Sequence, residues 1–178
     1  MVAGVIALAA SVASAADPPA LHLESRRLRS GAVFVGTVTA LRRLGALDGL
    51  TADTQGRMEA TVRIDKALRA PAGAAAPAEV AVKFDSRAPE PEGDGFLALA
   101  AGERVLVFAD GFDPAYPREL FHGAPKDVAA QVQALRDFVA TMDAPTMALH
   151  GLTPATQASQ VRLYDEALGQ LTKAASTR

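Results

Sequence analysis

The chain has 178 residues, a length that suits one domain built around a single hydrophobic core. Hydrophobic residues make up 49% of the chain and charged residues 21%, a composition typical of folded globular proteins that excludes disorder throughout. The 18 basic and 20 acidic residues give a net charge of −2, so the chain lacks the positive field that holds phosphate backbones, and no nucleic acid is expected as a partner.

Residues 1–16 have the pattern of a signal peptide. They contain no charged side chain, and an apolar run is followed by small residues that include Ala13-Ser14-Ala15, which fits the A-x-A pattern of a cleavage site. Cleavage after Ala15 and cleavage after Ala16 both fit. The apolar run is too short to span a bilayer, so we expect no stable membrane anchor after leader cleavage. These features predict a secreted or periplasmic protein; the alternative is an ordinary alanine-rich first helix or strand.

The chain contains no cysteine. Disulfides, a thiol nucleophile and thiolate metal ligands are therefore excluded. An exported protein of this kind must obtain its stability from packing alone.

A polar segment, residues 17–30, precedes the first predicted strand. Its leucines have a spacing that fits either a strand or a short helix. It also carries Arg26, Arg27 and Arg29, which with Arg42 and Arg43 are the basic features of the chain. We expect these arginines to face solvent and to protect exposed sheet edges. The alternative is contact with an acidic partner or an anionic lipid.

Four segments have the composition and alternation of β-strands, and a fifth strand is predicted by weaker signals. The first is rich in β-branched and aromatic residues, with Gly36 at a bend, a bulge or a close backbone approach. The second alternates strictly between apolar and polar residues, and the fourth is apolar on both faces at its centre. In chain order the five predicted strands are 32–41, 57–68, 79–85, 103–109 and 118–122, and residues 44–56 are predicted to form a loop.

Two helices are predicted after the strands. In residues 124–142 apolar side chains recur at spacings of three and four, Pro125 suits the first turn, and Pro145 limits continuation. Thr153 and Pro154 then have the pattern of a cap and a first-turn proline, followed by a second apolar stripe over residues 157–171. Strands followed by helices predict an α+β fold.

Residues 32–38, 60–68, 80–84 and 101–109 resemble the strands of the tissue-inhibitor-of-metalloproteinase and netrin-like superfamily. The shared features are apolar strand patterns around two glycines, and the predicted helix at 124–142 lies where the family places one after its barrel. The resemblance implies a five-stranded OB-type β-barrel with one or two C-terminal helices packed on it. The domain would comprise residues 17–142, and residues 143–178 would form a C-terminal helical extension.

Members of this family bind partners, and its protease inhibitors chelate the protease zinc through an N-terminal cysteine. This chain has no cysteine, so that inhibitory mode cannot be transferred to it. The resemblance therefore implies a binding module without the family's zinc-chelating group.

The best candidate binding residues follow the fourth predicted strand: Phe112, Tyr116, Arg118, Phe121 and His122. Aromatic side chains with an arginine and a histidine on a connecting segment are typical of partner contact. The alternative is that the aromatic rings close the mouth of the barrel.

Other candidate sites carry weaker patterns. The three histidines, His22, His122 and His150, are far apart in sequence, and we expect them to face solvent and to bind no metal. Four carboxylates gather around one Pro/Gly-rich loop, where we expect a solvated loop instead of a calcium site: Asp85, Glu90, Glu92 and Asp94. No nucleophile motif is present and no cofactor is expected.

These observations predict an exported, non-enzymatic binding or interaction module of TIMP-like fold, whose expected partner is another exported protein. One alternative is a protease inhibitor that uses a loop in place of the N-terminal cysteine. A further alternative is a hydrolase that depends on the carboxylates between Asp85 and Asp94.

Overall fold

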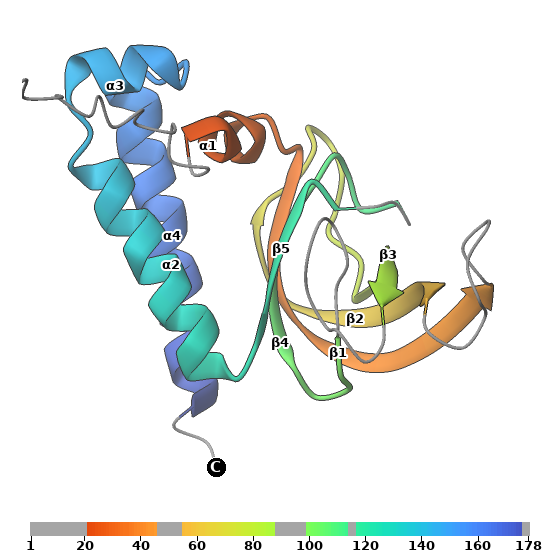
Figure 1. Ribbon diagram of the computed structural model, residues 1–178. Helices are drawn as coiled ribbons and strands as arrows, with labels where there is room; N and C mark the ends of the chain where they lie inside the picture. Colours follow the sequence, from red (N-terminus) through yellow and green to blue (C-terminus); the bar gives the residue numbers. More distant parts are fainter. Residues whose placement is uncertain (1–20, 46–54, 88–98, 114–116, 176–178) are drawn as a thin grey trace, which may run out of the picture.

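The computed structural model describes residues 21–45, 55–87, 99–113 and 117–175. A curved antiparallel sheet follows one short helix, and a layer of helices packs on one side of the sheet (Figure 1). The predicted α+β class, with strands before helices, is confirmed. The elements are α1 Leu21–Leu28, β1 Ala32–Gly45, β2 Gln55–Arg69, β3 Glu79–Arg87, β4 Arg104–Ala109, β5 Glu119–Gly123, α2 Pro125–Ala140, α3 Ala144–Leu149 and α4 Pro154–Ala175.

All five predicted strands are present, but β1 and β2 are longer than expected. Leu44 and Gly45, predicted to lie in a loop, belong to β1, and Gln55 and Gly56 belong to β2. The strands continue because β2 is paired on both sides: Gly45 pairs with Arg57, and β3 extends alongside β2 as far as Gln55. Cross-strand pairing here overrides the turn signal of the glycines.

The N-terminal polar segment resolves into a helix, α1, and a further short helix, α3, was not predicted. Pro145, expected to limit the chain after α2, lies in the first turn of α3. The Asp143 carboxylate caps this helix, accepting a hydrogen bond of 2.9 Å from the Thr146 backbone N–H. An aspartate followed by a first-turn proline is a start signal for a helix as well as a stop signal for the preceding one.

The strand order in the sheet is β3-β2-β1-β4-β5, and every neighbouring pair is antiparallel. β1 lies at the centre, paired with β2 on one side and with β4 on the other. In the described part of the chain β3 and β5 form the two edges, with no ladder joining them, so the sheet is open and the predicted closed barrel is not confirmed.

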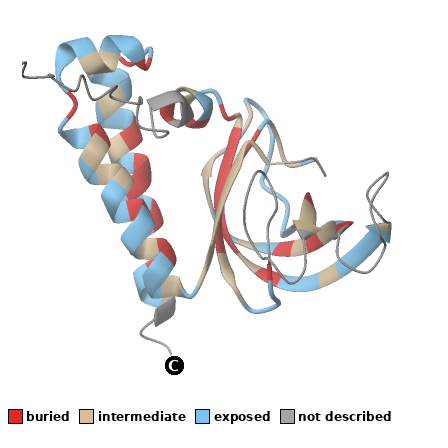
Figure 2. Ribbon diagram, in the orientation of Figure 1, coloured by how far each residue is buried: buried red, intermediate tan, exposed pale blue. Residues whose placement is uncertain are grey.

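The two faces of the sheet carry two separate apolar clusters. The outer cluster, which includes Val33, Leu106 and Tyr164, lies between the sheet and the helices, and the inner cluster, which includes Phe34 and Val82, lies on the other face of the sheet. Figure 2 shows the buried segments of the strands and helices in red. β4 contributes to both, since Val105 and Val107 belong to the inner cluster and Leu106 and Phe108 to the outer one. All four side chains are at most 1% exposed, which confirms the prediction of a strand buried on both faces.

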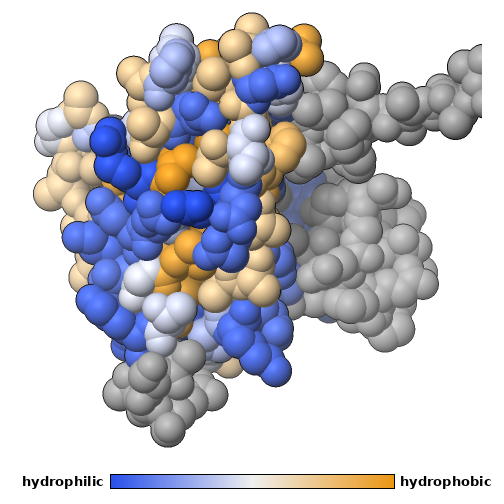
Figure 3. Space-filling view, turned by 90° about the vertical axis from the view of Figure 1, so that its left-hand side faces the viewer, coloured by the Kyte–Doolittle hydropathy of each residue, from blue (hydrophilic) through white to orange (hydrophobic). Residues whose placement is uncertain are grey.

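The helical layer is an antiparallel pair, α2 and α4, with α3 between them in sequence. The predicted apolar stripe of α2 lies in or against the outer cluster, as does that of α4, where Tyr164 and Leu171 are fully buried. On the opposite side the layer is largely hydrophilic with apolar patches between charged groups (Figure 3). Arg136 of α2, whose side chain is 34% exposed, donates a hydrogen bond of 3.0 Å to Asp165 of α4.

Gly36 marks a close backbone approach between β1 and β2. The register of the pair shifts between Val35 and Gly36. A Cβ atom on Gly36 would lie 2.5 Å from Val62 Cγ1 and 2.6 Å from the backbone oxygen of Arg63. Because a backbone atom cannot move aside as a side chain can, only glycine fits, and the prediction made for this position is confirmed.

We expect Gly36→Ala to destabilise the protein by about 1–3 kcal/mol, since the added methyl group overpacks a rigid site. Gly45→Ala, in the same strand, is the matched control because a Cβ there meets nothing within 4 Å. Urea unfolding of both variants measures the difference. Equal stabilities of the two variants would contradict the close approach.

Candidate functional site

The predicted binding residues lie within β5 and before its first residue. Along β5 the side chains alternate, so Leu120 packs on the inner cluster and Phe121 on the outer one. Phe112, just after β4, also packs on the inner cluster. Tyr116 lies outside the described residues. The structure therefore places Phe112 and Phe121 on opposite faces of the sheet.

Phe112 and Arg118 lie at the same end of the β4–β5 pair. The Phe112 ring centroid is 6.1 Å from that of Phe34, which places this aromatic ring against the core. Arg118 forms an ion pair with Asp110, and its side chain is 33% exposed. A partially exposed ion pair beside a half-buried phenylalanine forms the more accessible end of the predicted site.

His122 lies at the other end of β5. Its Nδ1 atom is 3.1 Å from Oε2 of Glu103, and the same oxygen accepts a hydrogen bond of 3.2 Å from the Ala100 backbone N–H. This carboxylate therefore joins the loop before β4 to β5. Because Arg118 and His122 are separated by the length of the strand, they do not form one compact cluster.

Phe121 faces the helices and connects β5 to α1. Its ring packs edge-on against Phe108, with centroids 6.2 Å apart. The guanidinium carbon of Arg27 lies 5.5 Å from the Phe121 centroid, within the range of a cation–π contact. This contact leads into a polar network that the sequence did not predict.

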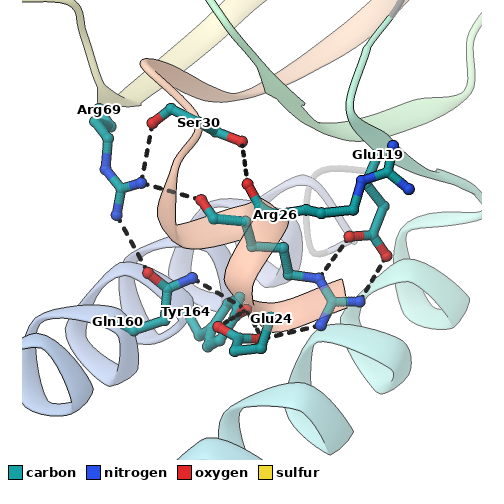
Figure 4. A network of polar contacts seen from close by, with 8 residues as sticks. Glu24, Arg26, Ser30, Arg69, Glu119, Gln160 and Tyr164 are labelled. Atoms are coloured by element: carbon teal, nitrogen blue, oxygen red, sulfur yellow. Dashed lines mark hydrogen bonds and ion pairs between the residues drawn. The ribbon is translucent and has the colours of Figure 1, made fainter. Parts of the chain in front are cut away.

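Arg27 connects α1 to β5 in this buried network, in which Glu24, Glu119 and Tyr164 are labelled in Figure 4. It forms a bidentate pair with Glu119 of β5, from Nε to Oε2 and from Nη2 to Oε1, both at 2.6 Å. Its Nη1 also donates to Glu24 at 2.9 Å, one turn earlier in α1. Arg27 is only 2% exposed, so its charge is compensated by these two carboxylates and not by water.

α4 supplies the other side of the network. The Tyr164 hydroxyl lies 3.0 Å from both carboxylate oxygens of Glu24 and donates to that carboxylate. Gln160 Nε2 donates to the Tyr164 oxygen at 3.1 Å. All three residues have an exposed fraction of 0%, so the hydrogen bonds replace their hydration completely.

Arg69, at the end of β2, caps the C-terminal end of α1. Its Nη1 donates to the backbone oxygens of Arg27, Leu28 and Ser30 at 3.1–3.2 Å, and its Nη2 donates to Gln160 Oε1 at 3.2 Å. The last carbonyls of a helix lack partners within the helix and carry partial negative charge. A guanidinium at this position donates hydrogen bonds to these carbonyls and compensates their partial negative charge.

The network changes the proton affinities of its members. Burial and the neighbouring Glu24 charge raise the pKa of Tyr164 well above its usual range. Burial by itself lowers the pKa of Arg27, but the hydrogen bond and the charge of Glu119 raise it by more. The pKa of Arg27 therefore lies above its ordinary value. Burial lowers the pKa of Arg69. The structure therefore favours a protonated Tyr164 beside Glu24.

The expectation that the N-terminal arginines face solvent is wrong for Arg27. The spacing of Glu24 and Arg27 is visible in the sequence, but their other partners, Glu119 and Tyr164, lie 92 and 140 residues away. The solvent-facing prediction is also wrong for His150, which is 3% exposed and packs edge-on against Phe138.

The remaining candidates of the sequence are only partly described. Asp85 lies in β3, while Glu90, Glu92 and Asp94 lie outside the described residues, as does the side chain of His22. Within the described ranges, no three His, Asp or Glu side chains gather as metal ligands would. Among the described helices, none is long and apolar enough to cross a bilayer. Comparison with protein-family models and with curated proteins finds no match.

We expect the protein to lose stability above about pH 10 through Tyr164. Tyrosine in the unfolded chain ionises near that pH, whereas the raised pKa of Tyr164 keeps the proton on in the folded state. The contribution is therefore fully present below this pH and is lost as the pH rises toward the folded pKa. Urea unfolding at neutral and alkaline pH should show a smaller loss for Tyr164→Phe than for the wild type.

Ser159→Ala, at an exposed position on the same helix, is the control and should lose stability as the wild type does. Parallel losses in all three proteins would contradict the assignment to Tyr164.

Proposed function

We propose that the protein is an exported, non-enzymatic binding module of TIMP-like OB type, with another exported protein as its partner. The single observation that carries the proposal is the strand order β3-β2-β1-β4-β5 with β1 shared between two antiparallel pairs. In this order the two edges of a curved sheet, β3 and β5, are the strands that closure would bring together. An OB-fold is a five-stranded, partly open barrel, which is compatible with such a sheet.

β5 supports a role in partner contact. It is an edge strand of only five residues in the described sheet, and all of them are partly accessible. Arg118 precedes it, Phe112 lies close by on the inner cluster, and His122 lies near its end. Aromatic and arginine side chains beside a strand edge offer apolar area, charge and backbone hydrogen-bonding groups to a partner.

Export is supported by the small-residue pattern that ends at Ala15 or Ala16. Mass spectrometry of the protein purified from the periplasmic or secreted fraction of its host should give a mature chain that begins at Ala16 or Asp17. A full-length chain that stays with the cytosolic fraction would refute export and leave the binding proposal to the next experiment.

Partner contact at β5 is tested with a photo-cross-linking amino acid at position 118. We expect a discrete cross-linked product with an exported protein, and a loss of that product when Phe112→Ala is added. The matched position is Arg162, which is exposed on α4 and distant in sequence from β5. Identical products from positions 118 and 162, or no product at 118, would count against β5 as the binding edge.

A further inference from the structure

The described side chains of α1, those from Glu24 onward, attach the helix to the rest of the protein mainly through charged and polar groups. Its backbone has little packing against the other described elements, in contrast to α2 and α4, which pack closely. Of the side chains described in α1, Leu28 is apolar and only half-buried, whereas Glu24 and Arg27 are buried. The helix is therefore positioned by long polar side chains that reach across to its neighbours.

The surface beneath α1 is assembled from three different elements. Glu119 of β5 accepts hydrogen bonds from the guanidinium of Arg27, and Tyr164 of α4 donates one to Glu24. Arg69 of β2 donates hydrogen bonds to the C-terminal carbonyls of α1. These elements are joined to one another by the sheet and the outer cluster, to which the described side chains of α1 add only the partly buried Leu28. The surface thus binds three features of a helix: a carboxylate, a guanidinium one turn later, and the last backbone carbonyls, which have no partner within the helix.

A close backbone contact at Gly31 separates α1 from the sheet. A Cβ atom on Gly31 would lie 2.3 Å from the backbone oxygen of Asp110, so the backbone at Gly31 is fixed against the end of β4. β1 begins directly afterwards, with Ala32 paired to Ala109. The boundary between α1 and the sheet therefore falls at Gly31, one residue after Ser30.

A buried ion pair of this kind adds little net stability relative to an apolar contact of the same size. Its attraction is offset by the free energy needed to remove the charges from water. The Glu119 side chain is 16% exposed and Arg69 is partly exposed even with α1 in place, so both charges lie near water and would be hydrated if α1 left. Segments that open at low free energy are those with few buried apolar contacts.

We propose that the surface formed by Glu119, Arg69, Tyr164 and Gln160 is a helix-binding site and that α1 is its resident, displaceable occupant. The partner it fits is a protein helix that carries a glutamate three residues before an arginine near its C-terminal end. These two residues are required because the surface is complementary in charge to Glu24 and Arg27 of α1. The proposal concerns a surface distinct from the inner side of β5 and stands apart from the proposed function.

Native-state hydrogen exchange on the full chain tests whether α1 is displaceable. The amides of residues 25–30 should exchange through an opening that leaves those of β1 and β4 protected, with at least about tenfold faster exchange. Exchange of α1 only together with β1 and β4 would show that the helix opens by global unfolding and would overturn the proposal. This measurement needs no variant and does not depend on any mutant folding.

A peptide of residues 17–30 tests recognition. The full chain with Glu24→Ala and Arg27→Ala, which weakens the resident helix, should bind the labelled peptide saturably, and the wild-type chain should bind it more weakly. The matched peptide carries Glu24→Arg and Arg27→Glu, which keeps composition and net charge. It should bind at least about tenfold more weakly, because charge-assisted hydrogen bonds are lost.

Equal binding of the two peptides, or no binding to the doubly substituted chain, would overturn the proposal. A wild-type chain that forms dimers by exchange of α1 would also overturn it, since the site would then serve a second copy and not a partner helix. Size-exclusion chromatography with light scattering across a concentration series distinguishes that outcome.

Discussion

The structure depends on one constraint: β1 and β4 are apolar on both faces, and both faces must be buried. Val33 and Val35 of β1 require cover on the outer side, whereas Phe34 and Val38 require it on the inner side. α2 and α4 cover the outer side, and the curl of the sheet brings β2 and β3 over the inner side. A flat sheet with helices on one face would leave the inner cluster exposed to water.

The polar network solves a different problem, the attachment of a short helix at the junction of the sheet and the helical layer. An isolated helix of eight residues is unstable in water, so α1 depends on tertiary contacts. Those contacts come from Glu119, Arg69 and Tyr164, which belong to three elements. Because each bond is directional, they fix the position of α1 more strongly than they stabilise it.

Much of the fold could be predicted because apolar residues recur at the spacing of a strand or a helix within each segment. The alternation around Val62 and the stripe from Val128 to Met142 each predict which side of the element faces the core, and both predictions are confirmed. The length of β1 and β2 could not be predicted, since Gly45 and Gly56 are held in strands by neighbours. Of the candidate site, the strand that carries Phe121 and His122 was predicted, but not that its aromatic ring faces the helices and contacts Arg27.

The sequence by itself determined the α+β class, the strand segments, the two main helices and the close approach at Gly36, because each depends on residues near one another in the chain. The tertiary structure decided that Arg27 and His150 are buried, that no ladder joins β3 to β5 in the described ranges, and that Glu24 contacts Tyr164. Burial of a charge depends on partners that lie 92 and 140 residues away, and no local pattern encodes such a distance.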